Sequence, residues 1–454
     1  MKKFLILFSL ISISIYGNAQ SNEVTIKKIV DETMTNGTCY SNLRILCKQV
    51  GPRLSGSPQF INAVRKVTDF MSDAGADTVY LQPCMIPHWI RGGKEIGVLT
   101  PSGGSNHQMN LTALGTSVGT GDVGITGQVI EINSMDDLPK LGTAGISGKI
   151  LFFNFKMNPT YINSFKAYGE SGVARRAGPA QASKYGAIGV MVRTLSNTLN
   201  DNPHTGTTRY SDSFPKIPAV AISTNDAEYL SAALAKGKVS AYFKTSCKTL
   251  PDVVGYNVIG EMRGSELPNK IITVGGHLDS WDLAEGANDD GSGVVQGIEV
   301  LRTLKSLQIR PKRTIRAVAF ANEEISGSGG KMYLEVAKQK HEDHLFALES
   351  DEGGFTPRGF SLDMTEEQQT KIKGWKALFS PYGVYNFIAG GSGSDIDYLK
   401  ELHTALCGLN PDTQRYFDIH HARTDIFENV SERELKLGAA NMTALVWLVS
   451  EYGL

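Results

Sequence analysis

The sequence has little cysteine, little net charge and no long hydrophobic run, and each shortage excludes a class of protein. Its 454 residues include five cysteines, an odd number with no Cys-x-x-Cys pair, which argues against a disulfide scaffold and against a thiolate metal site. Cys39 and Cys47 are close enough to pair, but free or buried thiols are the simpler expectation. The 45 Lys and Arg residues nearly balance the 46 Asp and Glu residues, and the formal charge of −1 gives no field to attract nucleic acid or an anionic membrane. No apolar run reaches the ~20 residues of a membrane-spanning helix, so we expect no membrane anchor.

The N-terminus has the form of a signal peptide. Lys2 and Lys3 precede an apolar stretch from Phe4 to Tyr16, and Gly17-Asn18-Ala19 has the small-x-small form of a cleavage site. The alternative is a buried N-terminal helix, which would not need this three-part pattern. We therefore expect residues 1–19 to be a signal peptide and the mature protein to be periplasmic or extracellular.

Glycine is the one residue in excess, since 48 of the 454 residues are glycine and ~7% is usual. No low-complexity repeat explains the excess, so it indicates many tight turns. Residues 104–248 fit this interpretation, because short β-rich segments such as 127–132 and 148–153 are bounded by glycine. From about residue 249, strands and helices alternate, which predicts a mostly parallel sheet covered by helices. The sequence thus predicts an α/β domain in two parts, 20–103 and 249–454, interrupted by residues 104–248.

Histidine and acidic residues follow the predicted strands of the α/β region where each strand ends. In an open α/β sheet such residues converge outside the carboxyl ends of the strands, although a single acidic cluster is more often a helix cap or a solvated loop. Five clusters at successive junctions are hard to explain in that way, and so many carboxylates in one cleft would repel one another without cations. The clusters are His277-Leu278-Asp279, Asn288-Asp289-Asp290, Glu323-Glu324, Glu349-Ser350-Asp351, and His420-His421 with Asp425.

The residue types at these positions favour zinc. Histidine and carboxylate without cysteine suit zinc better than harder metal ions, and two zinc ions ~3.5–4 Å apart can share a bridging carboxylate. His277 and Asp279 would share one face of a strand, so the Asp279 carboxylate is placed to orient the imidazole. Glu323 and Glu324 are adjacent, so one can bind metal while the other faces the reacting water as a general base.

These motifs, together with residues 286–293 and the His421-x-x-x-Asp425 step, resemble the co-catalytic zinc exopeptidase family, which includes bacterial zinc aminopeptidases and glutamate carboxypeptidases. Segments 50–57 and 86–92 are similar to the plasma glutamate carboxypeptidase branch of that family. Residues 104–248 look like an inserted protease-associated domain. The resemblance implies a three-layer α/β/α zinc-peptidase domain with a mixed, mostly parallel sheet, interrupted by this β-rich domain.

The resemblance also implies a role for each candidate residue around two Zn²⁺ ions per chain. His420 stands where several relatives have a tyrosine that stabilises the oxyanion, and an imidazole can donate the same hydrogen bond. The four-residue step to Asp425 favours His421 over His420 as a metal ligand. Ser394 lies in the glycine-rich segment 390–395, which resembles a substrate-pocket loop but can equally be an ordinary turn. The implied roles are ligands of one ion for His277 and Asp351, ligands of the other for Glu324 and His421, a bridge for Asp289, the general base for Glu323, and the orienting partner of His277 for Asp279.

The function implied by this resemblance is hydrolysis of dipeptides or short peptides with free termini by an exported zinc exopeptidase. An aminopeptidase of the same family is the alternative, because nothing in the sequence separates the two directions. Glutaminyl-cyclase-like acyltransferases of this fold keep a single zinc, and binding proteins on this fold lose metal ligands, whereas no ligand position is missing here. The expected partner is a peptide substrate, with a homodimer as one assembly that the family implies.

Several other polar residues receive ordinary interpretations. We expect Glu299 to be solvated on its helix and His344 to lie in a polar turn. His107 and His204 are expected in loops of the middle region. His88 is expected either to line the cleft or to pack against neighbouring side chains.

Overall fold

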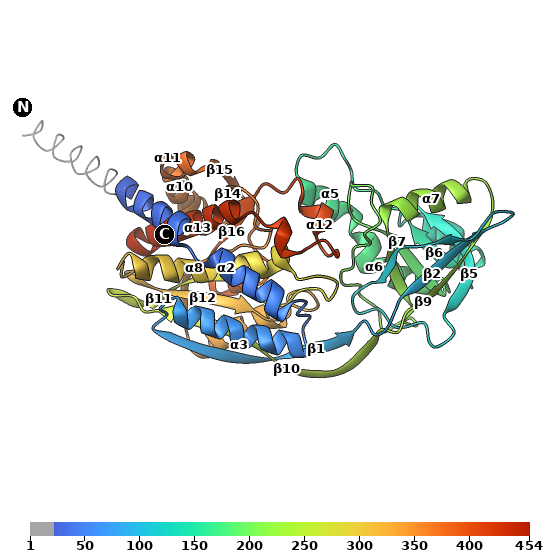
Figure 1. The fold of residues 1–454 in the computed structure, drawn as a ribbon, viewed down its shortest axis with the longest axis horizontal. Coiled ribbons are helices and arrows are strands. Elements are labelled where there is room, and N and C mark those ends of the chain that lie inside the picture. The colour runs from blue at the N-terminus through green and yellow to red at the C-terminus, as the bar shows by residue number, and fades with distance from the viewer. Residues whose placement is uncertain (1–21) are drawn as a thin grey trace, which may run out of the picture.

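The computed structural model describes residues 22–454, so the predicted signal peptide over residues 1–19 lies outside the described residues. Two eight-stranded sheets lie one after the other along the long axis of the molecule (Figure 1). Helices pack on both sheets, which makes the fold a mixed α/β fold with two sheets. Within residues 22–454, no helix combines the length and the hydropathy that a bilayer crossing requires.

The first sheet has parallel strands at its centre. In spatial order its strands are β1 (Thr78–Ile90), β10 (Lys248–Met262), β12 (Arg313–Phe320), β11 (Leu267–His277), β13 (Asp343–Glu349), β16 (Ala405–Pro411), β14 (Pro357–Asp363) and β15 (Asn386–Ala389). The pairs β11–β12, β11–β13 and β13–β16 are parallel, while β10 and β14 run antiparallel to their central neighbours. The parallel centre places the carboxyl ends of four strands at one edge, as the alternation of strands and helices predicts.

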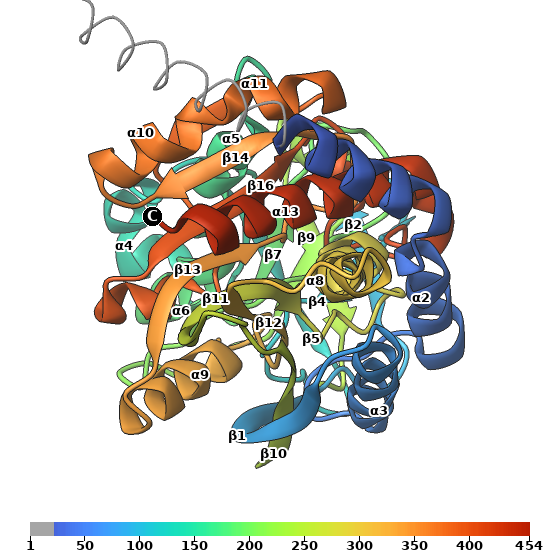
Figure 2. The same ribbon diagram turned by 90° about the vertical axis from the view of Figure 1, so that its left-hand side faces the viewer.

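Helices cover both faces of this sheet because successive side chains of its strands point to opposite sides. Ala317 and Ala319 of β12 belong to the core on one face, and Val318 and Phe320 belong to the core on the other. Figure 2 shows α8 and α13 on one side of the sheet and α9 on the other. The covering helices are α3 (Pro58–Asp73), α8 (Ser292–Ser306) and α13 (Glu432–Tyr452) on the first face, with α9 (Ser328–Gln339) and the 3-10 helix η4 (Asp397–Leu402) on the second.

Shorter helical segments complete this half of the molecule. They include a helix that covers residues 22–36, α2 (Cys39–Ile45), the π-helical turns η1 (Leu46–Val50) and η2 (Ala287–Gly291), α10 (Glu366–Gly374), α11 (Lys376–Phe379), η3 (Ser380–Tyr382), α12 (Tyr416–Ile419) and η5 (Phe427–Asn429). The turn η2 and the helix α12 matter most for the site, because each stands next to candidate ligands.

The second sheet is built from the middle of the chain. In spatial order its strands are β3 (His107–Gln108), β2 (Ile96–Pro101), β9 (Val239–Lys244), β5 (Ile125–Ile132), β6 (Ile150–Phe153), β7 (Gly189–Arg193), β8 (Ala219–Ile222) and β4 (Leu111–Ala113). Its helices are α4 (Asp137–Ile146), α5 (Ser164–Ser171), α6 (Val173–Lys184) and α7 (Thr224–Leu234). Apolar cores lie on both faces of this sheet, with Phe152 in one and Phe153 in the other. This part of the chain therefore contains more helix than its glycine-bounded strand segments indicate.

The two halves are joined by a long two-stranded ribbon. The antiparallel pairing of β1 with β10 runs from Thr78 opposite Glu261 to Ile90 opposite Lys248. The chain enters the second sheet after β1 and returns to the first through β10, so both crossings lie side by side. A partly buried salt bridge reinforces the junction, because Arg91 Nη2 lies 2.6 Å from Asp282 Oδ1 in the loop after β11.

Three local expectations can be compared with the structure. Glu299 is not solvated but buried, because its carboxylate accepts hydrogen bonds from the backbone N–H groups of Thr38 and Cys39 and so caps the start of α2. His344 does not lie in a turn but is buried in β13, beside Glu342. All five cysteines are free and buried, so Cys39 and Cys47 do not pair.

Candidate metal and catalytic site

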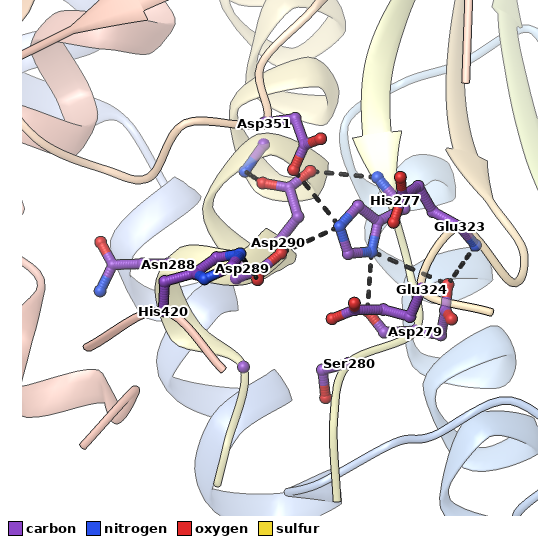
Figure 3. Close-up of polar contacts among 12 residues, drawn as sticks. His277, Asp279, Ser280, Asn288, Asp289, Asp290, Glu323, Glu324, Asp351 and His420 are labelled. Atoms are coloured by element: carbon purple, nitrogen blue, oxygen red, sulfur yellow. Dashed lines mark hydrogen bonds and ion pairs between the residues drawn. The ribbon is translucent and has the colours of Figure 1, made fainter. Parts of the chain in front are cut away.

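The predicted clusters meet at the edge of the first sheet where its parallel strands end (Figure 3). The turn η2 and the chain after α12 approach the same edge, so side chains far apart in sequence become neighbours there. The members are His277 as the last residue of β11, Asp289 within η2, Glu323 and Glu324 after β12, Asp351 after β13, and His420 and His421 after α12.

The Asp289 carboxylate lies between two groups of histidine and carboxylate. Its Oδ1 atom is 3.1 Å from Nε2 of His277, which is in turn 3.3 Å from Oδ1 of Asp351. Its Oδ2 atom is 3.2 Å from Nε2 of His421, which is 3.2 Å from Oε2 of Glu324. The structure therefore brings all five predicted ligands together, with one oxygen of Asp289 directed to each group.

The donor atoms of these groups fit divalent metal ions. Ligand atoms ~2.0–2.1 Å from a tetrahedral zinc ion lie about 3.3 Å apart, close to the separations found here. Asp289 Oδ2 and Glu324 Oε1 are buried and make no hydrogen bond of good geometry within the described chain. Burial and the nearby Asp289 carboxylate raise the pKa of Glu324 to about 7, as expected where carboxylates crowd without a cation. A bound cation would relieve this repulsion and bind these two oxygens.

Asp279 holds His277 through its backbone. The Nδ1 atom of His277 is 2.9 Å from the backbone carbonyl oxygen of Asp279 and 3.7 Å from its Oδ1 atom. The buried carboxylate instead accepts hydrogen bonds from Ser55 Oγ at 2.9 Å and from the backbone N–H of Glu323 at 3.1 Å. Asp279 thus contacts both His277 and the segment that carries Glu323.

His420 and His421 stack with ring centroids 3.6 Å apart. Both lie near Asp289, since His420 Nε2 is 3.5 Å from Asp289 Oδ2, but His421 also contacts Glu324. Burial and the neighbouring His421 lower the pKa of His420 well below its usual value, so this imidazole is neutral. A neutral imidazole can donate a hydrogen bond from one ring nitrogen.

A cavity of about 480 Å³ opens over these side chains. Both halves of the molecule line it, because α5, α6 and the segment after Pro203 reach the edge of the first sheet. From the first half it is lined by residues that include Asp289, Glu323, Glu324, Asp351, Ser394, Tyr398, His420 and His421, and from the second half by Phe165, Tyr168, Arg175, Arg176, Thr207 and Arg209. Ser394, a predicted substrate-binding candidate, therefore lies at the cavity.

Some residues around the site were given no role from the sequence. Asp290 accepts hydrogen bonds from the backbone N–H groups of His277 and Gly293, and so joins the end of β11 to the start of α8. Asp425 accepts from the backbone N–H of Asp289 at 3.1 Å. Both stand inside recognised motifs, which is a usable signal. No motif in the sequence marks Arg175 or Arg209 as site residues, because their proximity to the candidate ligands depends on how the two sheets pack.

Comparisons with known proteins place this chain among peptidases. The family model of peptidase family M28 matches residues 257–446. Carboxypeptidase Q of Homo sapiens is 32% identical over 445 residues, which are 98% of this chain and 87% of that protein. Carboxypeptidase Q of Xenopus laevis is 31% identical over 444 residues, which are 98% of this chain and 89% of that protein.

Solved structures show the same fold. The crystal structure of a peptidase M28 precursor from Shewanella amazonensis SB2B has a TM-score of 0.90 at 28% identity and covers 95% of this chain and 97% of its own. A zinc aminopeptidase from Bacillus subtilis has a TM-score of 0.65 at 21% identity and covers 90% of this chain and 94% of its own. The chain therefore belongs to peptidase family M28, the co-catalytic zinc exopeptidase family that its motifs resemble, and it is a metallopeptidase.

Proposed function

We propose that this protein is an exported exopeptidase that holds two zinc ions and hydrolyses dipeptides or short peptides with free termini, as a carboxypeptidase Q-like dipeptidase. The observation that carries the proposal is the Asp289 carboxylate, which directs one oxygen to each of two histidine–carboxylate groups. In this assignment His277 and Asp351 hold one ion, Glu324 and His421 hold the other, and Asp289 bridges them.

The residues around the cluster have complementary tasks in peptide hydrolysis. When bound, the two ions supply Lewis acidity to the scissile carbonyl and lower the pKa of the reacting water towards ~7. Glu323 lines the cavity beside the ligand groups, so its carboxylate takes the proton from that water and passes it to the leaving amine. The neutral His420 donates a hydrogen bond to the oxygen on which negative charge develops.

Positive charge at the cavity supports a substrate with a free C-terminus. Arg176 and Arg209 both line it, and within residues 22–454 no carboxylate forms an ion pair with either of them, while Arg176 donates to the Gly169 carbonyl. The guanidinium groups of Arg175 and Arg209, after burial itself, lower the pKa of Arg176, which shows that the three cations lie close together. An unpaired cluster of guanidinium groups fits a carboxylate, the group at the C-terminus of a dipeptide. This favours the dipeptidase or carboxypeptidase direction over the aminopeptidase alternative.

We also propose that residues 104–248 form an inserted domain of the protease-associated type. The support is that the chain leaves the first sheet after β1 and returns to it through β10. The proposed peptidase domain is residues 20–103 and 249–454, although β2 (Ile96–Pro101) pairs with β9 and so belongs to the second sheet. Residues 1–19 are the proposed signal that directs export.

A homodimer is the assembly that we propose. Leu81, Met85 and Val254 are 42%, 54% and 46% exposed on the β1–β10 ribbon, where Met85 pairs directly with Val254. Exposed apolar neighbours of this kind are typical of protein contact surfaces. Measurement of the mass in solution tests this, and a monomer at micromolar concentration would contradict it.

A panel of blocked and unblocked peptides tests the proposed activity. Free dipeptides should be hydrolysed in the presence of zinc and not after treatment with a chelator. N-acylated peptides should still be cleaved by a carboxypeptidase, C-terminal amides should still be cleaved by an aminopeptidase, and a dipeptidase should require both free ends. If the zinc-bound protein hydrolyses none of the peptides, the proposal is contradicted.

A further inference from the structure

One short segment of the second half, residues 204–207, contacts two of the candidate metal ligands, His421 and Glu324. The backbone N–H of Thr205 donates to the carbonyl oxygen of His421 at 2.9 Å, and Nδ1 of His421 lies 3.3 Å from the carbonyl oxygen of Thr205. Two residues later, the Thr207 hydroxyl donates to the backbone carbonyl of Glu324. The segment therefore contacts both residues that we assign to one of the two zinc ions.

His421 needs this support because of its backbone. Its φ of 60° lies in the left-handed region, which is unfavourable for a residue with a Cβ atom. The bond from Thr205 N–H holds that backbone in place. A neutral imidazole that offers Nε2 to a metal carries its proton on Nδ1, and the Thr205 carbonyl is placed to accept a hydrogen bond from that N–H. Arg175 Nη1 also lies 3.4 Å from Nδ1, so a metal on Nε2, together with the Thr205 carbonyl, sets the tautomer against this neighbouring donor.

Gly206 lets the segment come this close. Its φ is +125°, and a Cβ atom there would lie 2.4 Å from Arg175 Nη1 and 2.7 Å from His421 Nδ1. Any side chain at this position would therefore displace His421 or Arg175. From the other side the segment is fixed by the second half, since Gly115 N–H donates to the Gly206 carbonyl at 3.0 Å and the Thr205 hydroxyl donates to the Ala113 carbonyl at 2.9 Å.

The other ligand pair is supported differently. His277 is the last residue of β11, its ring is held by the Asp279 carbonyl, and its backbone N–H donates to Asp290. All of these supports belong to the first half of the molecule. The two proposed metal positions are therefore unequal, since one is supported by the first sheet and the other by contacts from both halves.

We propose that residues 205–207 position His421 and Glu324, so that the zinc ion held by these two residues depends on the inserted segment whereas the ion held by His277 and Asp351 does not. This rests on the two-zinc assignment of the proposed function and adds a role for the inserted part of the chain. Thr205, Gly206 and Thr207 are positioning residues, since they act through His421 and Glu324 rather than on the substrate.

Zinc titration of the metal-free full-length protein against a chromophoric chelator tests the proposal. Gly206→Ala and Thr207→Val should each raise the dissociation constant of one zinc ion by about 10- to 100-fold and leave the other unchanged, because loss of a group that orients a ligand has an effect of this size. Gly121→Ala is the matched control, since Gly121 also has a positive φ, +75°, but a Cβ atom there would meet nothing within 4 Å. The control should match the parent in both constants.

Each outcome of the titration decides a separate point. Two unchanged constants in both variants, or two constants weakened equally, would overturn the inference while leaving the proposed function intact. A parent protein that binds fewer than two zinc ions would instead overturn the two-zinc assignment itself. Circular dichroism of the metal-free proteins identifies a variant that has not folded, and if Gly206→Ala fails in this way Thr207→Val decides.

Discussion

The Nδ1 atom of His277 lies 2.9 Å from the backbone carbonyl oxygen of Asp279, while the Asp279 carboxylate is bound to Ser55 and to the backbone N–H of Glu323. The support of the histidine therefore comes from the main chain, which a side-chain substitution leaves in place. The carboxylate acts mainly on the segment that carries Glu323. These two tasks of one residue can be separated by experiment.

Asp279→Asn should leave zinc affinity nearly unchanged and lower kcat by about 10- to 100-fold, because the carbonyl that holds His277 remains while the acceptor for the Glu323 N–H is altered. Zinc content and steady-state kinetics on a free dipeptide measure the two effects. Ser55→Ala, which removes the other partner of the same carboxylate, should change kcat in the same direction but less. Loss of zinc from Asp279→Asn would show that the carboxylate supports the metal directly.

Glu323→Gln should retain two zinc ions and lose about 10²- to 10⁴-fold in kcat, since an amide cannot accept the proton of the reacting water. Burial, together with the carboxylates of Asp351 and Glu324, raises the pKa of Glu323 to about 8 in the metal-free protein, so removing its charge should not lower stability. Metal analysis, kinetics and thermal unfolding of the same sample measure these quantities. A variant that remains active would exclude Glu323 as the base.

Arg209→Gln should raise KM by about 10- to 100-fold for peptides with a free C-terminus, the usual effect of losing a hydrogen bond to a charged group. Peptides with a C-terminal amide should be affected little, because they offer no carboxylate to Arg209. Arg65→Gln is a suitable control, since Arg65 is exposed on α3 and is bonded to Asn62. An equal effect on both kinds of peptide would contradict carboxylate binding at this position.

A partly buried ion-pair cluster at the amino end of β13 predicts a dependence of stability on pH. Burial alone would raise the pKa of Glu342, but hydrogen bonds from His344 and Arg316 lower it from 4.5 to about 2. A depressed carboxyl pKa stabilises the folded protein above the unfolded value, and this stabilisation is lost as the pH falls from about 4.5 towards 2. Glu342→Gln should therefore lower the free energy of unfolding on the order of 2 kcal/mol at pH 7.

The difference in unfolding free energy between this variant and the parent should become smaller as the pH falls below about 4.5. Urea unfolding at several pH values measures it. Glu335→Gln, a change at a half-exposed surface residue, serves as the control and should show little difference at any pH. A constant difference between pH 7 and pH 3 would mean that the Glu342 charge is not the cause.

The candidate ligands could be predicted from the sequence because their positions follow local rules. His277, Glu324 and Asp351 each stand at the end of an apolar strand, and parallel strands place such ends at one edge whatever the details of packing. The helices around that edge were also readable, since α3 and α8 show the helical spacing of apolar residues. The same local rules misplaced Glu299, because a carboxylate on a helix is usually solvated and only the approach of α2 buries it.

By itself, the sequence determined the family and the set of histidines and carboxylates, because strand ends and motif spacing are local properties of the chain. Only the tertiary structure decided which groups support those side chains. Thr205 and His421 are separated by 216 residues, and no pattern in the sequence predicts that the carbonyl of Thr205 contacts the imidazole of His421. That contact depends on the way the second sheet packs against the edge of the first, and packing between two surfaces is a sum of many weak contacts that no single segment encodes.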